Sequence, residues 1–462
     1  MSEPAFHAPK ALLISLYCAT AAYGTLQSIV VPVLPEITRQ LGANHVEAGW
    51  VLTSFLLVGG AVTPVLGRLG DMFGNLRAMA VTLTIFIVGT CIALFAPTIG
   101  ILIVGRLLQG FGAATVSIGY ALVQRLYPPR QAVGAVGMLA GATAASAAIG
   151  LSLAGVVTLY FDFRAIFVLP LLAAVLSLIL IVPQIRAELR PRRAPVDINW
   201  LGAVLFFAGT ALLLLTITQA GSEGWLNPST LSIALASVVT LTGWIWSERR
   251  SRQPLLDVRL LVAPHVALIN ATTLFAGAFA LGAFSLLPVA LQTGAPPGLG
   301  LSAAVVGLIA LPISGLNFVT SSFTGRISAR LGAPGMLSLG LGLSGAALTV
   351  AGLLHASPWG FVLAAAIHGV GIGMFFSALP ALTMMAADRG EAGSAAGVFL
   401  TLRSVGSAIG TQLVFVLLAT STPQQPGSGI VAAFAAIASF WAGALLLALA
   451  VMRNRKIAKR KR

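Results

Sequence analysis

Long apolar runs recur along this sequence and constrain its fold more than any other feature. An α-helix needs about 20 apolar residues to cross the roughly 30 Å hydrocarbon core of a bilayer. Hydrophobic residues make up 58% of the 462-residue chain and charged residues only 8%, against about 25% charged in a soluble domain. We therefore expect an all-α integral membrane protein with fourteen transmembrane helices, near residues 11–34, 48–66, 78–97, 99–121, 132–158, 165–183, 199–219, 230–247, 264–291, 301–323, 334–354, 358–385, 392–419 and 429–452.

The distribution of basic residues supports an even number of spans. When the N-terminus is placed in the cytoplasm and the spans alternate, 23 of the 27 Lys and Arg residues fall on the cytoplasmic side. Only Arg39 and Arg164 lie in outside loops, and Arg106 and Arg403 lie within spans. This asymmetry follows the positive-inside rule. It predicts that both termini are cytoplasmic.

The two ends of the chain carry further signals. The apolar run after Lys10 is too long for the core of a cleavable signal peptide, so it is interpreted as the first spanning helix. The basic tail over 453–462 could contact anionic lipid or nucleic acid. No aromatic stacking residues accompany its charges, which favours membrane lipids and argues against nucleic acid as a partner. The two cysteines, Cys18 and Cys91, lie in apolar runs and indicate no disulfide framework.

An internal repeat divides the chain into two halves. GRLGDMFG at 67–74 recurs as GRISARLG at 325–332, and Gln109-Gly-Phe-Gly recurs as His368-Gly-Val-Gly. Parallel repeats in a membrane protein place a substrate site near the midplane, between the halves. The expected organisation is an N-terminal six-helix bundle over 1–183, a linker with two extra spans over 184–262, a C-terminal six-helix bundle over 263–452 and a basic tail over 453–462.

These motifs resemble those of the major facilitator superfamily. GRLGDMFGNLR after the second helix and RLLQGFGAA in the fourth carry the resemblance, which covers nearly the whole chain. VDINWLG before the inserted pair, Gly224-Trp225 and PLLDVRLL at 254–261 are similar to the fourteen-helix drug:proton antiporter branch, as is AGWVLTSFLL at 48–57. The resemblance implies a major facilitator fold and export of amphipathic small molecules.

The loop between the second and third helices is the first functional element that the resemblance implies. In the family this loop holds the halves together on the cytoplasmic side while the transporter faces outward. The corresponding residues are Gly67, Asp71, Gly74 and Arg77, whereas Met72 and Asn75 replace the usual basic residues. The alternative is a solvated turn with an isolated aspartate.

Arg106 in the fourth helix is the second implied element. A buried arginine costs at least about 2.5–3.5 kcal/mol on insertion scales, so it should face a polar interior. The resemblance implies that Arg106 takes part in proton transfer; the alternative is a structural arginine bonded to backbone carbonyls of the first helix. Gly110 and Gly112 after it should let another helix approach closely, and we expect the same packing role for Gly150 and Gly155 in the fifth helix.

Two departures from the family put proton antiport in question. The fifth helix has GLSLAG at 150–155, where the antiporter motif has a proline and a further glycine. The first helix has Leu26 where the branch usually has an aspartate, and none of the twelve carboxylates falls in the middle of a span. The remaining proton carrier is His368, which can titrate near neutrality or stay neutral in a hydrogen bond.

A sparsely polar cavity is expected between the halves. Arg403 could bind an anionic group there, or pair with Asp388 or Glu391 near the start of its helix. Because two arginines and no acid lie in the spans, we expect neutral or anionic compounds to be preferred over cationic ones. The candidate cavity residues are Tyr23, Gln27, Gln109, Asn270, Asn317, Arg403 and Gln412.

Three function classes remain at this point. The leading hypothesis is a secondary transporter that exports amphipathic compounds from the bacterial cytoplasmic membrane as a monomer. The second is a proton-independent facilitator, or a lipid or metabolite carrier, of the same fold. The third, a membrane enzyme or sensor, lacks any convergent acid–base set in the sequence, and no motif predicts a cofactor or metal.

The topology gives the first testable prediction. Single cysteines placed before residue 10 and after residue 453, in a chain without Cys18 and Cys91, should both resist an impermeant thiol reagent in intact cells. Both should react after permeabilisation. Labelling of only one of the two ends in intact cells would require an odd number of spans and would contradict the two-bundle organisation.

Overall fold

The computed structural model describes residues 10–126, 160–187, 199–251, 264–294, 298–386, 392–420 and 427–453, with isolated positions elsewhere. All regular structure among these residues is helical. The elements are α1 (Lys10–Leu41), α2 (His45–Phe73), α3 (Asn75–Leu94), α4 (Ile99–Gly110), α5 (Ala113–Leu126), the 3₁₀ turns η1 (Phe163–Phe167) and η2 (Val182–Ala187), α7 (Val168–Ile181), α8 (Trp200–Glu223), α9 (Pro228–Arg250), α11 (Pro264–Gln292), α12 (Ala303–Ser322), α13 (Thr324–Leu353), α14 (Pro358–Ala386), α15 (Ala392–Leu418) and α16 (Ser428–Arg453).

The predicted all-α membrane fold is confirmed. Thirteen helical segments of the described residues are long and apolar enough to cross a membrane. They coincide with thirteen of the fourteen expected spans, and their ends differ by a few residues. The remaining span, predicted at 132–158, lies largely outside the described residues.

Local sequence signals explain where several helices begin. Asn44 and Glu47 form a reciprocal cap at the start of α2, with each side chain accepting a hydrogen bond of 2.9 Å from the other's backbone N–H. At the start of α9 the Asn227 side chain accepts from Ser229 N at 3.0 Å, and Pro228 occupies the first helical position. These caps satisfy N–H groups that a helix leaves free at its first turn, which matters most near a bilayer.

The turn between α2 and α3 is tighter than the sequence predicts. Residues 67–73, expected as a loop, continue α2, and Gly74 alone leaves the helix with φ 108°. Its N–H donates to the Gly70 carbonyl at 2.9 Å. The second copy of the motif behaves alike, because residues 324–331 are helical and Gly332 breaks the helix with φ 70°. Only glycine adopts this backbone conformation readily, so the last glycine of each copy forms the turn.

The span predicted over 99–121 contains a short break between two helices. α4 ends at Gly110 and α5 begins at Ala113. Between them Gly112 N donates to the Gln109 carbonyl at 2.9 Å and Thr115 N donates to the Gly112 carbonyl at 3.0 Å. These bonds join residues three apart and mark a short tightening of the helix. The predicted span is confirmed, because Ile99–Val123 as a whole is long and apolar enough to cross a membrane.

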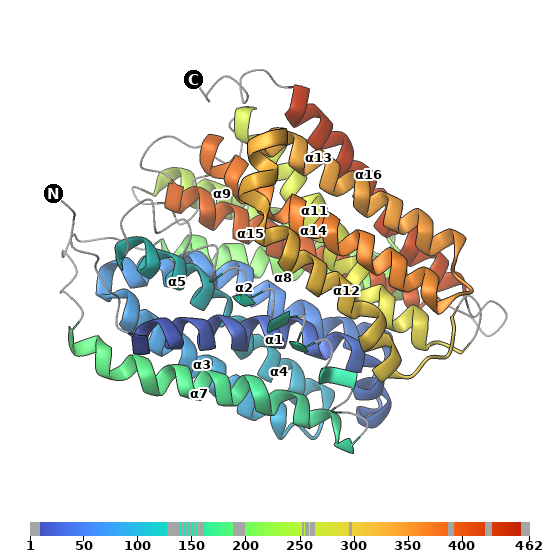
Figure 1. Cartoon of the computed structure of the whole chain (residues 1–462), viewed down its shortest axis with the longest axis horizontal. Helices are drawn as coiled ribbons and strands as arrows, with labels where there is room; N and C mark the ends of the chain where they lie inside the picture. The colour runs from blue at the N-terminus through green and yellow to red at the C-terminus, as the bar shows by residue number, and fades with distance from the viewer. Residues whose placement is uncertain are drawn as a thin grey trace.

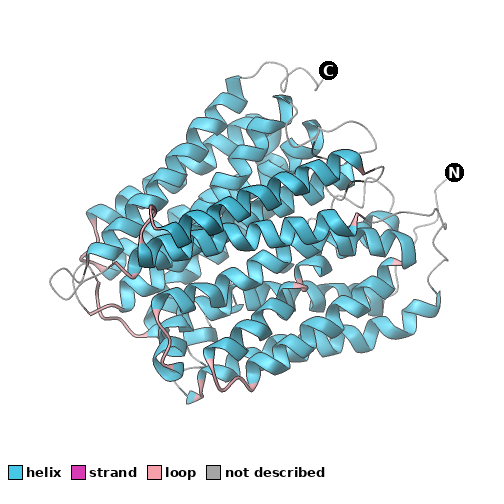
Figure 2. Cartoon of the chain, turned by 180° about the vertical axis from the view of Figure 1, so that it is seen from behind, coloured by secondary structure: helices cyan, strands magenta, loops and turns pink. Residues whose placement is uncertain are grey.

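The helices pack in two groups with a pair of helices beside them (Figure 1). In the first group α1 packs on α7, and α4 packs on α2 and α3; in the second, α14 packs on α12 and α13, and α11 packs on α15 and α16. The inserted helices α8 and α9 pack on each other. Seen from behind, short loops join long helices throughout the described chain (Figure 2).

Equivalent contacts between a glycine and a carbonyl of a neighbouring helix occur in both groups, so the sequence repeat corresponds to a structural repeat. A Cβ atom on Gly110 would lie 2.7 Å from the Phe55 carbonyl oxygen, and one on Gly369 would lie 2.6 Å from that of Ile313. Likewise, a Cβ atom on Gly24 would lie 2.6 Å from the Thr143 carbonyl oxygen, and one on Gly277 would lie 2.6 Å from that of Arg403.

The two groups meet mainly through α2 and α15. A Cβ atom on Gly49 of α2 would lie 2.9 Å from the Cβ of Phe415, and one on Gly60 would lie 2.9 Å from the Cβ of Ser404. A second contact involves the C-terminal part of α1, where Gln292 Nε2 of α11 donates to the Pro32 carbonyl at 3.0 Å. The inserted helix α8 contacts both α2 and α15. It therefore lies against the junction and not at the periphery of one group.

Replacing Gly110 with alanine tests these packing contacts. We expect the substitution to destabilise the protein by about 1–3 kcal/mol, because the added methyl group would collide with the α2 backbone. The melting temperature in detergent, followed by fluorescence-detected gel filtration, measures the change.

Gly315 in α12 is the matched control, because nothing lies within 4 Å of a Cβ there. Gly315→Ala should leave the melting temperature unchanged or raise it, since alanine is the better helix former. Equal stability of the two variants would contradict the contact.

Candidate functional site

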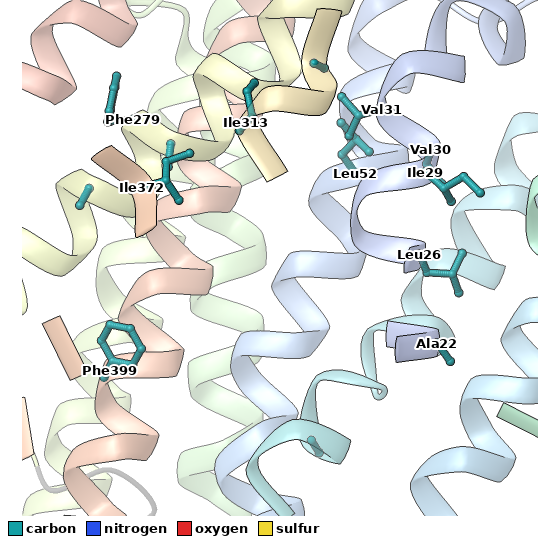
Figure 3. Close-up of a cluster of buried hydrophobic side chains, with 14 of the residues drawn as sticks. Ala22, Leu26, Ile29, Val30, Val31, Leu52, Phe279, Ile313, Ile372 and Phe399 are labelled. Atoms are coloured by element: carbon teal, nitrogen blue, oxygen red, sulfur yellow. The ribbon is translucent and has the colours of Figure 1, made fainter. Parts of the chain in front are cut away.

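A small cavity lies between the two groups of helices. Its volume is about 10 Å³, room for about one water molecule. In Figure 3, Val31 and Leu52 lie beside each other on the side of α1 and α2 that faces the C-terminal helices. The lining residues come from α1, α2, α4 and α11 and are Gln27, Val31, Leu52, Phe55, Leu56, Arg106, Leu281 and Ser285.

Arg106 is the charged group of this cavity, and its side chain is fully buried. Its Nε donates to the Val51 carbonyl at 2.9 Å, and Nη1 donates to Gln109 Oε1 at 2.8 Å. The guanidinium carbon lies 4.2 Å from the centre of the Phe55 ring, a cation–π distance. Nη2 is buried without a hydrogen-bond partner in the described structure. The bond to a backbone carbonyl agrees with a structural arginine, but the carbonyl belongs to α2 and not to the first helix as predicted. Nη2 leaves one donor for another acceptor.

Tyr23 connects Arg106 to the opposite half. Its ring stacks on Phe55, with centroids 5.3 Å apart and planes 18° from parallel. Its hydroxyl interacts electrostatically with both Arg106 and Arg403. Since Arg106 comes from α4 and Arg403 from α15, this phenol is within electrostatic reach of cations from both halves.

Arg403 is less enclosed than Arg106 but shares its pattern of contacts. Its Nε is buried and has no hydrogen-bond partner in the described structure. Its guanidinium carbon lies 5.5 Å from the centre of the Phe376 ring. The side chains of Asp388 and Glu391, which were considered as its partners, lie outside the described residues.

Gln412 joins three helices at the junction. Its Oε1 accepts from Thr53 Oγ1 of α2 at 3.1 Å, and its Nε2 donates to Thr218 Oγ1 of α8 at 2.8 Å. The side chain is fully buried. Gln412, predicted as a cavity residue, therefore links α15 to both α2 and α8.

Two of the predicted cavity residues, and the proton-coupling candidate His368, lie apart from this group. His368 packs edge-on against Phe279 at 5.3 Å, and its Nε2 is buried without a hydrogen-bond partner in the described structure. Asn317 accepts from Ser321 Oγ at 3.1 Å within α12. Asn270 is buried in α11. None of these three lines the small cavity, whereas Gln27 does.

The latch residues occupy the end of α2 and the start of α3. Gly67 has open space around it, Gly74 forms the turn, and Arg77 Nη1 donates to the Phe73 carbonyl at 3.4 Å across that turn. The side chain of Asp71 lies outside the described part of the structure. A contact from this turn to the other half stays a prediction.

Three of the glycines expected at helix contacts lie close to neighbouring helices. Beside the Gly110 contact, a Cβ on Gly112 would meet the Phe86 ring of α3, and one on Gly150 would lie 2.9 Å from the Thr25 carbonyl of α1. Gly155 is buried.

The sequence analysis missed several residues of this region. The Phe55 ring stacks on Tyr23 and lies under the Arg106 guanidinium. Thr53 and Thr218 form hydrogen bonds with Gln412. Phe55 follows Val51 by one helical turn, but no sequence signal marks the carbonyl that an arginine binds, so this signal appears only in the structure. A threonine that bonds across helices has no local signal, because most threonines in this structure bond to carbonyls of their own helix.

The fold and the cavity together define a class of protein. Two similar groups of membrane-spanning helices enclose a small site that holds buried polar and cationic side chains, as in a membrane transporter. The chain belongs to the Major Facilitator Superfamily, whose profile matches residues 16–411. Members of this superfamily are transporters of small molecules and not enzymes.

Two curated relatives match most of this chain. An uncharacterised transporter of this superfamily from Mycobacterium tuberculosis is 28% identical over 413 residues, covering 88% of this chain and 59% of that protein. The chain therefore spans about three-fifths of that relative's length. The multidrug resistance protein Stp of the same organism is 26% identical over 405 residues, covering 85% of this chain and 73% of Stp.

A solved structure shows the same fold. The chain is similar to the crystal structure of a POT-family peptide transporter in complex with sulfate, with a TM-score of 0.69 and 16% sequence identity. The match covers 98% of this chain and 96% of that one. At this identity the likeness shows the fold alone.

The Gln412 bridge gives a prediction about cooperation between the inserted helices and the junction. Gln412→Leu and Thr218→Val should each lower stability by about 0.5–1.5 kcal/mol for a lost hydrogen bond. The double variant should cost less than the sum of the two, as measured by thermal unfolding in detergent.

Thr242→Val serves as control, because Thr242 bonds only to the Val238 carbonyl of its own helix. That substitution should combine additively with Gln412→Leu. Additive effects for both pairs would mean that the bridge does not couple α8 to α15.

Proposed function

We propose that this protein is a secondary transporter that exports amphipathic small molecules by alternating access. The observation that carries the proposal is the cavity between the halves, which is mostly apolar and holds the buried guanidinium of Arg106. An apolar pocket with few polar groups suits amphipathic ligands. The similarity to the multidrug resistance protein Stp supports the same substrate class.

Proton coupling is part of the proposal, and its candidates are Arg106 and His368. Arg106 has a buried donor that can respond to a changing neighbour, and His368 has a buried ring nitrogen that can take up a proton. The alternative is a proton-independent facilitator or a lipid or metabolite carrier. It is favoured by the positions of the described carboxylates, which lie near the ends of their helices, as Glu36, Glu47 and Glu223 do.

The turn at Gly74 would regulate the conformational change. We propose that Gly67, Asp71, Gly74 and Arg77 form a contact on the cytoplasmic side that favours the outward-facing state. The one-residue turn supports this idea, because it keeps the ends of α2 and α3 rigidly joined. Loss of the usual basic residues at Met72 and Asn75 should make the contact weak.

The setting of the proposed function is the bacterial cytoplasmic membrane. The bacterial relative Stp and the many apolar helices support this localisation. We propose that both termini are cytoplasmic, that the basic tail binds anionic lipid and that the protein works as a monomer. The domain boundaries are proposed at residues 183, 262 and 452.

A transport assay tests this proposal and the source of coupling. Cells that lack their own efflux pumps and express the protein should accumulate less of an exported amphipathic drug than cells with the empty vector. If transport is proton-coupled, a protonophore should abolish the difference, and His368→Ala should reduce it at least about tenfold if this residue is the essential carrier.

His355→Ala is the control, because His355 is exposed just after α13 and its ring nitrogen lies 3.0 Å from the Gly352 carbonyl oxygen. It should leave export unchanged. Export that persists without a proton gradient would overturn the coupling and favour the facilitator. No export of any compound in a broad screen would overturn the proposed function itself.

A further inference from the structure

We propose that Arg106 and Arg403, together with Tyr23, form a binding site for the negatively charged group of an amphipathic organic anion. The inference rests on the proposed function and specifies its substrate class. The ligand would be a monocarboxylate or similar anion on an apolar, aromatic body. It would touch both halves of the protein at once.

The geometry of the donors supports this site. Arg106 is fully buried and uses Nε and Nη1 on protein partners, but its Nη2 has none in the described structure. Arg403 also keeps a buried Nε without a partner there. Buried donors of this kind are costly unless something pairs with them. A carboxylate, which only accepts hydrogen bonds, matches them.

The charges around the site favour an anion. The ion pairs found among the described residues are Glu36–Arg39 and Asp162–Arg164, and neither includes Arg106 or Arg403. Two cations near a membrane interior repel each other and lose hydration. Both costs fall when an anion binds between them. A cationic ligand would add a third positive charge, so it should be excluded.

Aromatic rings surround the two guanidinium groups and suit the apolar body of the ligand. Phe55 lies under Arg106 and stacks with Tyr23, and Phe376 lies beside Arg403. The Tyr23 hydroxyl, which interacts with both cations, can donate to the same anion. The cavity of about 10 Å³ is too small for such a ligand, so the described conformation would be one in which the site is closed.

The position of the two arginines links binding to conformational change. Arg106 belongs to the N-terminal group and Arg403 to the C-terminal group, so a bound carboxylate would join the halves electrostatically. A ligand shifts a conformational equilibrium by its difference in affinity for the two states. The anion would therefore favour the state in which the two arginines are closest.

Three naphthalene compounds that differ mainly in charge test the proposal. They are 1-naphthaleneacetate, the neutral 1-naphthaleneacetamide and the cationic 1-naphthylethylamine. Equilibrium binding to the full chain in phosphatidylcholine nanodiscs should be at least about tenfold tighter for the anion than for the amine, the factor expected from one charged hydrogen bond. Equal affinities for the three compounds would overturn the proposal without any variant.

Variants assign the selectivity to the arginines. Arg403→Gln should weaken binding of the anion about tenfold and leave the amide unchanged, Arg403→Lys should keep part of the preference, and Tyr23→Phe should weaken the anion a few-fold. Arg39→Gln, which removes an exposed arginine of α1, is the control and should change nothing. Equal weakening of all three compounds by Arg403→Gln would mean that Arg403 is structural.

Two further arms separate other outcomes. If phosphatidylglycerol nanodiscs weaken binding of the anion to the unchanged chain but not to Arg403→Gln, an anionic lipid headgroup occupies the site and the assignment to a soluble substrate fails. Uptake of the same compounds into proteoliposomes separates the two proposals. Transport without charge preference would overturn this inference alone, whereas anion-selective binding without transport of any compound would overturn the proposed function alone.

Discussion

Close contact between helix backbones is the interaction on which this structure depends. In lipid, apolar side chains gain little by leaving the solvent for a neighbouring helix, so association depends on packing and hydrogen bonds. Glycine permits that packing, because the absence of a side chain lets a neighbouring carbonyl approach. Gly110 against Phe55 and Gly369 against Ile313 repeat the same contact in the two halves. The two halves therefore have the same residue, glycine, at this close contact between backbones.

The chemistry of the site is not duplicated in the same way. The interval of 259 residues between Gln109 and His368 places Ala365 opposite Arg106. The matching contacts of Gly24 with Thr143 and of Gly277 with Arg403 place Thr143 opposite Arg403. Each half therefore contributes one arginine, at a different helix, to a region where its counterpart has a small or neutral residue. A duplicated framework that carries unlike groups gives an asymmetric cavity. An amphipathic ligand, with one charged end and one apolar end, fits such a cavity better than a symmetric one.

Much of the fold could be predicted from the sequence, and the reason is physical. Backbone groups in lipid must bond within a helix, so thirteen spans follow from the apolar runs alone, and the repeat follows from GRLGDMFG and its second copy. The helical character of residues 67–73 was not predictable from glycine content, because the bond from Gly74 N to the Gly70 carbonyl decides where α2 ends.

The site itself was predictable only in part. Arg106, Tyr23 and Gln27 were found because a charge or a polar group in an apolar run is conspicuous. Their partners were not found. Val51 contributes a carbonyl, which every residue has, and Phe55 is one of 23 phenylalanines. Which of these meets an arginine depends on the rotation of α2 against α4, and that rotation is set by the Gly110 contact. Asn317 was grouped with the cavity for the same reason, yet its described hydrogen bond is with Ser321. His368, predicted as a proton carrier, contacts Phe279.

The inserted helices add a constraint that a two-bundle protein would lack. Gln412 binds Thr53 on one side and Thr218 on the other, and a Cβ on Gly221 would collide with Val416 of α15. Helix α8 thus packs against both α2 and α15 where the halves meet. If the halves rock about this junction, α8 has to slide on one of them or break the Gln412 bridge. Since the side chain of Gln412 is fully buried, breaking its bonds without new partners is costly. The inserted pair should therefore limit the angle through which the halves can turn.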